Sequence, residues 1–186
     1  MWNDWKGTLL LNLYFRTEKI LQGGAEGLRR ELSASAKADE VRALVEPALV
    51  PLVDDQFACL GERYVASFTA REIASHLVCL NEAREDGLAV EHQRHAPSGM
   101  STLVVCTRDR PGLFSQIAGC LVCQLIDVNG AALFTRPDGF VIDWFVVADA
   151  SRRRPLTERE AVAFGRLLRR VLLDGEDIRC HVDQSK

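Results

Sequence analysis

Residues 107–119 (TRDRPGLFSQIAG) have the residue types of a loop that binds a ligand at the start of a helix. An apolar run ends in charged residues, and Pro111 and Gly112 follow just before a helical pattern. Pro111 fits the first helical position, where no N–H is needed, and Asp109 or Arg110 would cap the helix. Gly112 lacks a Cβ, so a ligand can approach the backbone. The free N–H groups of the first turn, at the positive end of the helix dipole, can then hold a carboxylate such as that of an amino acid.

The same spacing also fits a tight turn that does no more than lead into a helix, so it leaves both interpretations open. Asp143 is a second polar candidate, since it interrupts an apolar strand pattern. We expect it to be exposed at an edge or face of a sheet. His76, beside Leu77 on a predicted helix, is expected to be an ordinary surface or boundary histidine.

Cys120 and Cys123 form a CysXXCys spacing that raises the possibility of redox or metal chemistry. Redox pairs lower a thiol pKa at a helix N-terminus, whereas these two residues fall late in the predicted helix. A metal site would need a second pair of ligands, and His92 with His95 is a weak pair. We therefore expect the cysteines to pack as small apolar residues.

Bulk composition excludes several classes of partner. The chain has 186 residues, 47% of them hydrophobic, which is enough for a real core. With a net charge of −3 it offers no long-range attraction to nucleic acid or to an anionic membrane. No apolar run approaches the roughly 20 residues of a membrane span, and the N-terminus does not resemble a signal peptide. We expect a cytoplasmic protein, in which the six cysteines need not pair.

The first part of the chain, residues 1–87, is predicted to be helical. Asn3 or Asp4 can cap a first helix that stops at residues 22–24, and a second helix runs from Ala25 into the forties, where Pro47 and Pro51 break it. Residues 54–68 are predicted to be irregular. A capping box at residues 69–72 (TARE) then opens a third helix that continues toward Gly87.

The second part, residues 88–186, is predicted to be an α+β domain. Residues 88–94 form a short strand before a linker at 96–99, and the chain then alternates as strand 102–107, helix 111–125, strand 128–135 and strand 140–147. Residues 136–139 (RPDG) are typical of a hairpin turn, and a second capping box at 157–160 (TERE) opens another helix. Ile178, Cys180 and Val182 suggest a short last strand. A βαββαβ order folds as a ferredoxin-like antiparallel sheet with both helices on one face.

Three separated stretches carry a resemblance to a known family. Residues 108–119 (RDRPGLFSQIAG) and 134–147 (FTRPDGFVIDWFVV) resemble an ACT domain of the bacterial PII uridylyltransferase/uridylyl-removing enzymes. Residues 2–19 and 63–76 (RYVASFTAREIASH) resemble linker helices of the same enzymes. The resemblance covers nearly the whole chain in the right order, and identifies it as similar to their C-terminal regulatory region.

The resemblance implies a function in nitrogen signalling. These enzymes attach UMP to the PII protein and remove it, and glutamine bound at the ACT domains sets the direction. Their catalytic domains, which use Mg, have no counterpart here, so we expect neither a catalytic site nor a cofactor in this chain.

In ACT domains the loop before the first helix meets the start of the second strand of a neighbouring ACT domain. The residues implied as ligand-binding come from both segments: Asp109, Arg110, Pro111, Gly112, Leu113, Asp127 and Val128. A lone ACT domain would need a homodimer partner.

The second predicted strand departs from the family pattern. Asp127 stands where the family often has Asn, and Gly130 and Ala132 replace its Asp and Arg. An acid at the pocket mouth would repel a carboxylate and attract an ammonium group. Two hypotheses therefore remain: a glutamine sensor, and a dimerisation element that binds no small ligand. RNA recognition by the same fold would need aromatic residues on the first strand, which has none.

Overall fold

The computed structural model describes residues 34–95 and 99–178. The helix predicted from Asn3 or Asp4 to residue 24 lies outside the described residues. The chain divides into two compact units, residues 1–78 and 79–186, and each is described by itself. The boundary predicted near residue 87 coincides with the end of one helix and the start of the first strand, whereas the division into units falls inside that helix.

Three helices form the described part of the first unit, and the third continues into the second unit: α2 (Ala34–Leu44), α3 (Val50–Ser67) and α4 (Ala70–Asp86). The prediction that residues 54–68 are irregular is wrong, because residues 54–67 belong to α3 and only Phe68, the C-cap, is extended. Pro51 lies in the first turn of α3, where a proline costs no hydrogen bond, so it begins a helix rather than breaking one. Gly61 (φ 68°, ψ −172°) kinks the helix, which interrupts the apolar periodicity that sequence patterns rely on.

A buried polar cluster lies inside the first unit. The Tyr64 hydroxyl is 2.8 Å from His76 Nδ1 and accepts a hydrogen bond of 3.0 Å from Gln56 Nε2. The expectation that His76 lies at the surface is wrong, since it is only 1% exposed. Burial lowers the pKa of His76 to about 3, so the imidazole is neutral near pH 7.

Buried Lys37 contacts the end of α3. Its ammonium group donates to the carbonyl oxygens of Val65 (2.7 Å) and Phe68 (2.9 Å). These oxygens lie at the C-terminal end of the helix, where the dipole favours a cation. A charge that would be costly to bury alone therefore closes the last turn of α3.

Both predicted capping boxes are present. Thr69 N donates to Glu72 Oε2 (2.7 Å) and Glu72 N donates to Thr69 Oγ1 (3.3 Å), at the start of α4. Thr157 and Glu160 make the same reciprocal pair at 2.7 and 3.3 Å and open α6 (Glu158–Leu172). Because these bonds are local, the residue types alone were enough to predict them.

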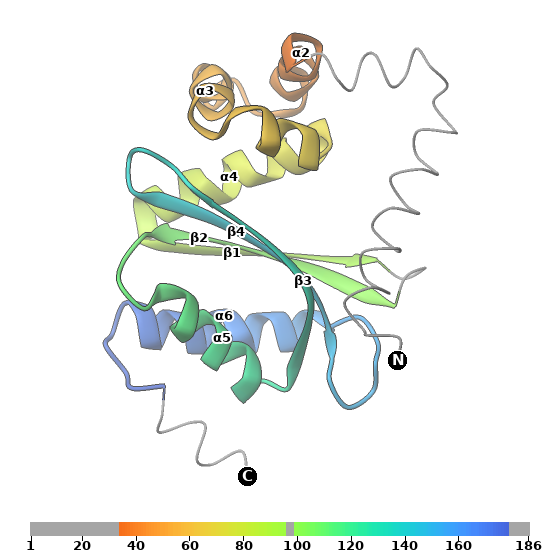
Figure 1. Cartoon of the computed structure of the whole chain (residues 1–186), viewed down its shortest axis with the longest axis vertical. Coiled ribbons are helices and arrows are strands. Elements are labelled where there is room, and N and C mark those ends of the chain that lie inside the picture. The colour runs from red at the N-terminus through yellow and green to blue at the C-terminus, as the bar shows by residue number, and fades with distance from the viewer. Residues whose placement is uncertain (1–33, 96–98, 179–186) are drawn as a thin grey trace. The chain divides into compact units, whose positions relative to one another are not determined.

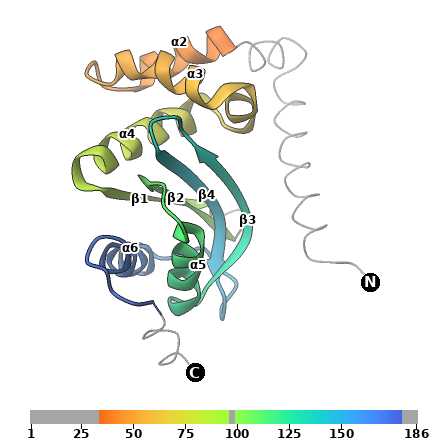
Figure 2. The ribbon, with the colours of Figure 1, turned by 60° about the vertical axis from the view of Figure 1, so that its left-hand side comes forward.

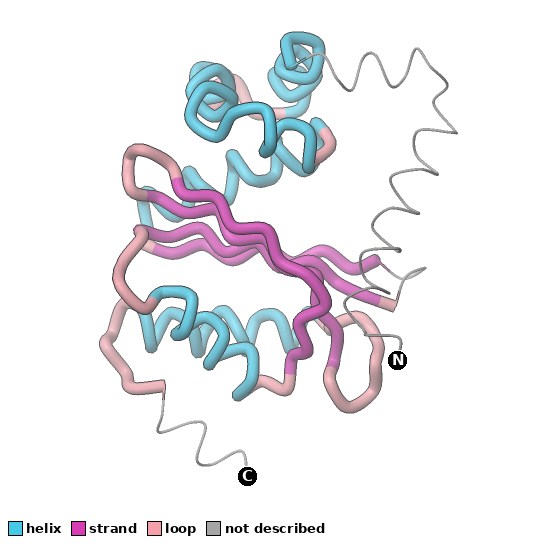
Figure 3. The backbone as a smooth tube through the Cα atoms, in the orientation of Figure 1, coloured by secondary structure: helices cyan, strands magenta, loops and turns pink. Residues whose placement is uncertain are grey.

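The second unit is a four-stranded antiparallel sheet with two helices on one face (Figures 1 and 3). Its strands are β1 (Leu88–His95), β2 (Met100–Arg108), β3 (Ile126–Thr135) and β4 (Phe140–Asp149), and α5 (Leu113–Cys123) and α6 follow β2 and β4. The strand order is β1-β2-β4-β3. The predicted ferredoxin-like α+β architecture, with both helices on the same face, is confirmed.

One edge of the sheet differs from the predicted order. In a βαββαβ sheet the last strand pairs with the first, but here β1 pairs with β2 in that place. The predicted last strand is wrong at its first residue, because Ile178 lies in a turn, and Cys180 and Val182 lie outside the described residues. The short strand predicted at 88–94 is thus correct, and its hairpin with β2 gives it the edge position. From β1 to the last described residue, the order of elements is therefore ββαββα.

The two central strands, β2 and β4, are covered on both faces. On the face of α5 and α6 they contribute Leu103, Val105 and Phe145 to a core that also holds Ile117 and Phe164. On the opposite face Val104, Cys106 and Ile142 are buried as well, and Cys79 of α4 lies 4.0 Å from the Val104 carbonyl oxygen. Burial on both faces explains why these strands are almost continuously apolar.

The β3–β4 hairpin closes as its sequence predicts. Arg136 N donates to Phe140 O (2.8 Å), and Gly139 adopts φ 81°. Burial opposes ionisation of Asp138, but hydrogen bonds from Arg136 and Arg84 lower its pKa to about 2. Asp138 is therefore a carboxylate at all ordinary pH values, and it fixes the turn.

Candidate functional site

The loop between β2 and α5, residues 109–112, is held at both ends. Asp109 N donates to Gly139 O (2.8 Å), which attaches the loop to the β3–β4 hairpin. Leu113, the first residue of α5, is buried in the core. Between these anchors Pro111 and Gly112 are exposed. The loop is therefore a firmly positioned surface feature.

Helix α5 begins later than predicted. Its first residue is Leu113, and Gly112 (φ 79°) is the N-cap, so Pro111 lies in the preceding turn rather than at the first helical position. The predicted caps, Asp109 and Arg110, are wrong, because the N-cap is Gly112, which has no side chain to cap the helix. The reason is the left-handed conformation of Gly112, which turns the chain sharply between the loop and the helix.

Leu113 N donates to Arg110 O (3.1 Å), and a helix start without a side-chain cap leaves the following backbone N–H groups of the first turn available to a ligand. A Cβ placed on Gly112 would meet no atom within 4 Å, so there is open space beside this residue. The glycine is thus needed for its positive φ and not because protein atoms press on it. This geometry suits a small anion at the N-terminus of α5.

Arg110 is directed away from the helix start. Its Nη1 donates to the carbonyl oxygen of Leu172 (2.7 Å), in the last turn of α6. The guanidinium group therefore connects the loop to the C-terminal end of α6, where the helix dipole is negative.

Asp143 lies inside the sheet, and the expectation of exposure is wrong. It is 5% exposed and pairs with Val105 of β2, which lies in the core on the α5 and α6 face. Burial, and then the negative charge of Asp109, raise the pKa of Asp143 to about 7. Sequence reasoning noticed this residue but misplaced it, because only the strand order shows that β4 is central.

Asp127 and Val128 are not brought to the loop within one copy of the chain. They lie at the start of β3, beyond the far end of α5, and α5 has 11 residues, which span roughly 16 Å. Both are exposed. A site made from the predicted residues therefore requires the loop of one copy and the β3 strand of another.

Strand β3 and helix α5 expose an apolar surface, which we call the α5/β3 flank. On α5 and just after it Phe114, Val122 and Leu125 are 52%, 59% and 59% exposed. On β3, Val128 and Leu133 are exposed. They lie opposite Val147 and Asp143 of β4, and residues directly opposite each other point to the same face of a sheet, here the face that bears the helices. Strand β3 pairs only with β4 among the described strands, so its outer edge is open. Exposed apolar residues beside an open strand edge are typical of an association surface.

The two cysteines of α5, Cys120 and Cys123, pack in or against the hydrophobic core. Cys120 is fully buried in the core, and burial raises its pKa to about 12. Burial also raises the pKa of Cys123. Within the described ranges, no group of three or more His, Cys, Asp or Glu residues could hold a metal ion. Neither thiol is activated, as expected for cysteines that pack.

Taken together, the ferredoxin-like sheet, the paired helices on one face and the uncapped helix after β2 define the second unit as an ACT-like module. Figure 2 shows α5 and β3 along one side of it. None of the helices in the described ranges is both long and apolar enough to cross a membrane.

Comparison with known proteins shows which enzymes the chain is related to. It is 31% identical over 173 residues to the bifunctional uridylyltransferase/uridylyl-removing enzyme of Phenylobacterium zucineum, covering 90% of this chain and 18% of that protein. The enzyme of the same name from Rhodospirillum rubrum is 30% identical over 149 residues, and that from Haemophilus influenzae is 28% identical over 178. No family model matches the chain. The chain is a homologue of a segment of these enzymes and spans about a fifth of their length.

Proposed function

We propose that this chain is an ACT regulatory module of a uridylyltransferase-like protein, and that it senses an amino acid, glutamine, in nitrogen signalling through PII. The observation that carries the proposal is the similarity of 80–90% of the chain to a segment of bifunctional uridylyltransferase/uridylyl-removing enzymes. The open N-terminus of α5 supports it, because this is a suitable place for an amino-acid carboxylate.

The proposed site combines two copies of the module. Pro111 has no N–H and Leu113 N already donates to Arg110 O (3.1 Å), so the remaining backbone N–H groups at the start of α5 hold the carboxylate, and Gly112 leaves room for it. Asp127 and Val128 approach from the β3 strand of a second copy, and the Asp127 carboxylate attracts the ammonium group. The α5/β3 flank, with its open strand edge, is the surface through which the copies would associate.

In the related uridylyltransferase/uridylyl-removing enzymes, transfer and removal of the uridylyl group belong to other parts of the protein. Those catalytic parts are also the ones that use Mg. We expect the purified chain to bind ligand without catalysing either reaction. An activity that co-purified with the chain and survived loss of Asp109 and Asp143 would contradict this.

Isothermal titration calorimetry against glutamine and a panel of other amino acids tests the proposal, with light scattering on the same sample. We expect saturable glutamine binding by a dimer and at least a tenfold weakening in Gly112→Asn. Asn tolerates the left-handed conformation, so this change adds bulk at the helix start with little backbone strain. Gly99→Asn, at another positive-φ glycine (φ 70°), is the matched control and should bind normally.

A second candidate is a dimerisation element that binds no small ligand. The α5/β3 flank favours it, as does the negative charge of Asp109, which adds to burial in raising the pKa of Asp143 and would also repel a carboxylate at the loop. It predicts a dimer that gives no heat with any amino acid, which separates it from the sensor.

A further inference from the structure

Helix α6 and the loop before it carry a concentration of positive charge. Residues 149–174 contain seven arginines, no lysine and four acidic residues, a formal charge of +3 in a chain whose net charge is −3. Figure 1 shows this segment leading from the end of β4 into α6. Arginine rather than lysine suits two-point binding of carboxylates or phosphates, because its guanidinium group is a planar fork of donors.

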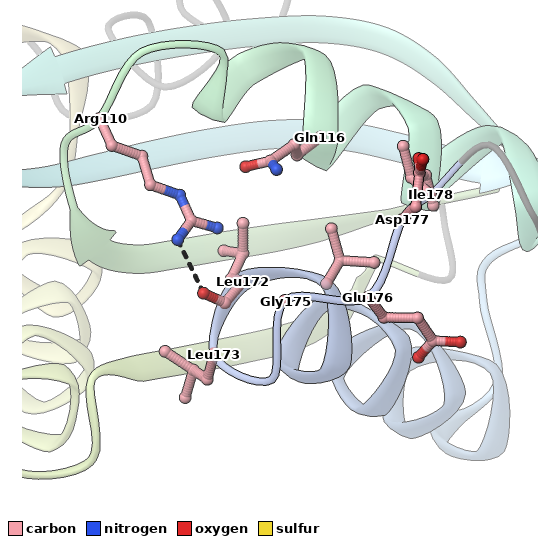
Figure 4. A pocket seen from close by; sticks show the side chains of 9 residues that line it. Arg110, Gln116, Leu172, Leu173, Gly175, Glu176, Asp177 and Ile178 are labelled. Atoms are coloured by element: carbon pink, nitrogen blue, oxygen red, sulfur yellow. Dashed lines mark hydrogen bonds between the residues drawn. The ribbon is translucent and has the colours of Figure 1, made fainter.

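At the C-terminal end of α6 the arginines are engaged within the fold. A pocket of about 560 Å³ lies there, next to the β2–α5 loop (Figure 4). Arg110 donates to the Leu172 carbonyl oxygen in it (2.7 Å), and Glu176, which also lines it, pairs with Arg170 (3.3 Å). Arg169 donates to a backbone carbonyl oxygen of β1 (3.1 Å). These cations therefore stabilise the packing of α6.

Four other arginines of the segment are exposed, and their side chains make no hydrogen bond or ion pair within the described part of the chain: Arg152, Arg153, Arg159 and Arg166. We call these four the α6 basic surface. Arg159 and Arg166 are seven residues apart, nearly two turns, so they lie on one stripe of the helix about 10 Å apart. Glu158, the acidic residue next to Arg159 in the chain, contacts His92 Nδ1 (3.3 Å). The four guanidinium groups therefore offer their donors to a partner.

The β4–α6 loop holds two of these arginines in a fixed position. Asp149 Oδ1 accepts hydrogen bonds from Ser151 N (2.9 Å) and Arg152 N (2.9 Å), and Arg154 forms an ion pair with Asp149 (2.8 Å). Within this framework Arg153 adopts φ 48°, a left-handed conformation that is uncommon for a residue other than glycine. Strained conformations that the surrounding structure maintains are concentrated at binding sites. The loop is therefore preorganised to present Arg152 and Arg153.

The surroundings of these arginines indicate which class of anion they bind. Val162, 42% exposed, lies between Arg159 and Arg166 on the same stripe of α6. An apolar side chain adds nothing to the binding of phosphates, and the exposed residues of 149–174 include no aromatic side chain on which a nucleobase could stack. A net charge of −3 also opposes binding to a long polyanion or an anionic membrane. A protein segment with carboxylates on both sides of an apolar residue fits all three observations.

We propose that the α6 basic surface binds an acidic helical segment of a partner protein, with carboxylates two turns apart and an apolar residue between them. The carboxylates bind Arg159 and Arg166, the apolar residue packs on Val162, and a further acidic residue reaches the loop arginines. The surface contains no residue of α5 or β3, so it is separate from the α5/β3 flank. It gives the chain a contact with a second protein, which goes beyond the proposed function and does not depend on ligand binding.

Fluorescence anisotropy of the full chain with a labelled peptide tests the proposal. The peptide has fifteen residues, with glutamates seven positions apart, a leucine between each pair and alanines elsewhere. At about 150 mM NaCl, where long-range attraction between exposed charges is screened, we expect saturable binding. The double variant Arg159→Gln, Arg166→Gln should weaken it at least tenfold, and Arg153→Gln at least threefold. Arg71→Gln, at an exposed arginine of α4, is the matched control and should bind within twofold of the wild type.

A second peptide of the same composition, with its glutamates consecutive, separates the predicted geometry from bulk charge. We expect it to bind at least threefold more weakly than the spaced peptide. No binding of the spaced peptide, equal binding of the two peptides, or less than a twofold effect of the double variant would overturn the proposal, provided that circular dichroism shows each variant to be folded.

A single-stranded oligonucleotide and vesicles that contain anionic lipid are titrated in parallel. Tighter binding of either one than of the spaced peptide would overturn the assignment of a protein partner. These results do not bear on glutamine binding, which calorimetry measures separately, so failure of this proposal and failure of the proposed function are distinguishable.

Discussion

At the scale of single residues, Asp143 has an environment that gives it a pH-dependent effect on stability. Its pKa is raised to about 7 in the folded state, above its ordinary value of 3.8. The folded state therefore binds more protons than the unfolded state between pH 4 and 7, so this carboxyl group costs stability as the pH rises through that window. The full cost at pH 8 is at most about 4 kcal/mol.

We expect Asp143→Asn to be more stable than the wild type at pH 8, and the difference to shrink steadily toward pH 4. Urea unfolding at a series of pH values, followed by circular dichroism, measures it. Asp127→Asn, at an exposed position, should show no such trend. A difference between Asp143→Asn and wild type that is constant from pH 4 to 8 would contradict the buried, protonatable carboxyl.

His76 has the opposite influence, in the first unit. Its pKa is lowered to about 3 by burial, below the ordinary 6.5, so the unfolded state binds more protons between these values. Stability from this group is fully present above pH 6.5 and is lost as the pH falls toward 3, by at most about 5 kcal/mol. As the pH falls from 7 to 4, the free energy of unfolding of the first unit should therefore decrease. Over the same range protonation of Asp143 should increase the free energy of unfolding of the second unit.

We expect His76→Gln to flatten this acid dependence, because glutamine can hydrogen-bond to Tyr64 without titrating. Hydrogen exchange with mass spectrometry between pH 5 and 7.5, corrected for intrinsic rates, reports on peptides of each unit separately. His95→Gln is the control and should leave the first unit unchanged. An acid-weakening of the first unit that is as steep in His76→Gln as in the wild type would disprove the role of this histidine.

At the scale of elements, the segment after α6 packs closely against α5 at Gly119. A Cβ on Gly119 would lie 2.8 Å from Ile178 Cγ1, closer than real contacts, so either the helix or the segment must shift. Alanine normally stabilises a helix interior relative to glycine by about 1 kcal/mol. Here the helix propensity and the contact with Ile178 oppose each other.

We expect Gly119→Ala to be destabilising or neutral, and the same change to become stabilising in an Ile178→Ala background. Gly165→Ala is the matched control, since Gly165 is also inside a helix but its Cβ would meet Val90 only at 3.9 Å. That variant should gain about 0.5–1 kcal/mol. Thermal unfolding of the four variants checks this, and equal gains for Gly119→Ala and Gly165→Ala would refute the close fit.

At the scale of the whole molecule, the α5/β3 flank predicts association of copies. We expect the double variant Val122→Glu, Leu133→Glu to be monomeric where the wild type is a dimer, because two charges would be buried without partners. Val162→Glu, at a comparably exposed site (42%) on α6, is the control and should still dimerise. Sedimentation velocity over a range of concentrations measures this. A wild type that stays monomeric at all concentrations, or a charged variant that still dimerises, would remove the flank as the interface.

Local features of the fold could be predicted from residue types alone. The capping boxes at Thr69 and Thr157, the hairpin at Gly139 and the apolar strands each depend on contacts between near neighbours in the chain, so residue types were sufficient. The resemblance to uridylyltransferases was also readable in short stretches, and similarity over most of the chain confirms it.

Features that depend on distant segments of the chain became visible only once the segments were packed together. The edge position of β1 and the burial of Asp143 follow from strand order, and no local pattern specifies that order. The bond from Arg110 to Leu172 joins residues 62 positions apart, and it brings the loop, α5 and the end of α6 around one pocket. Such contacts arise when the core packs, which is why the sequence predicted the loop but not the pocket beside it.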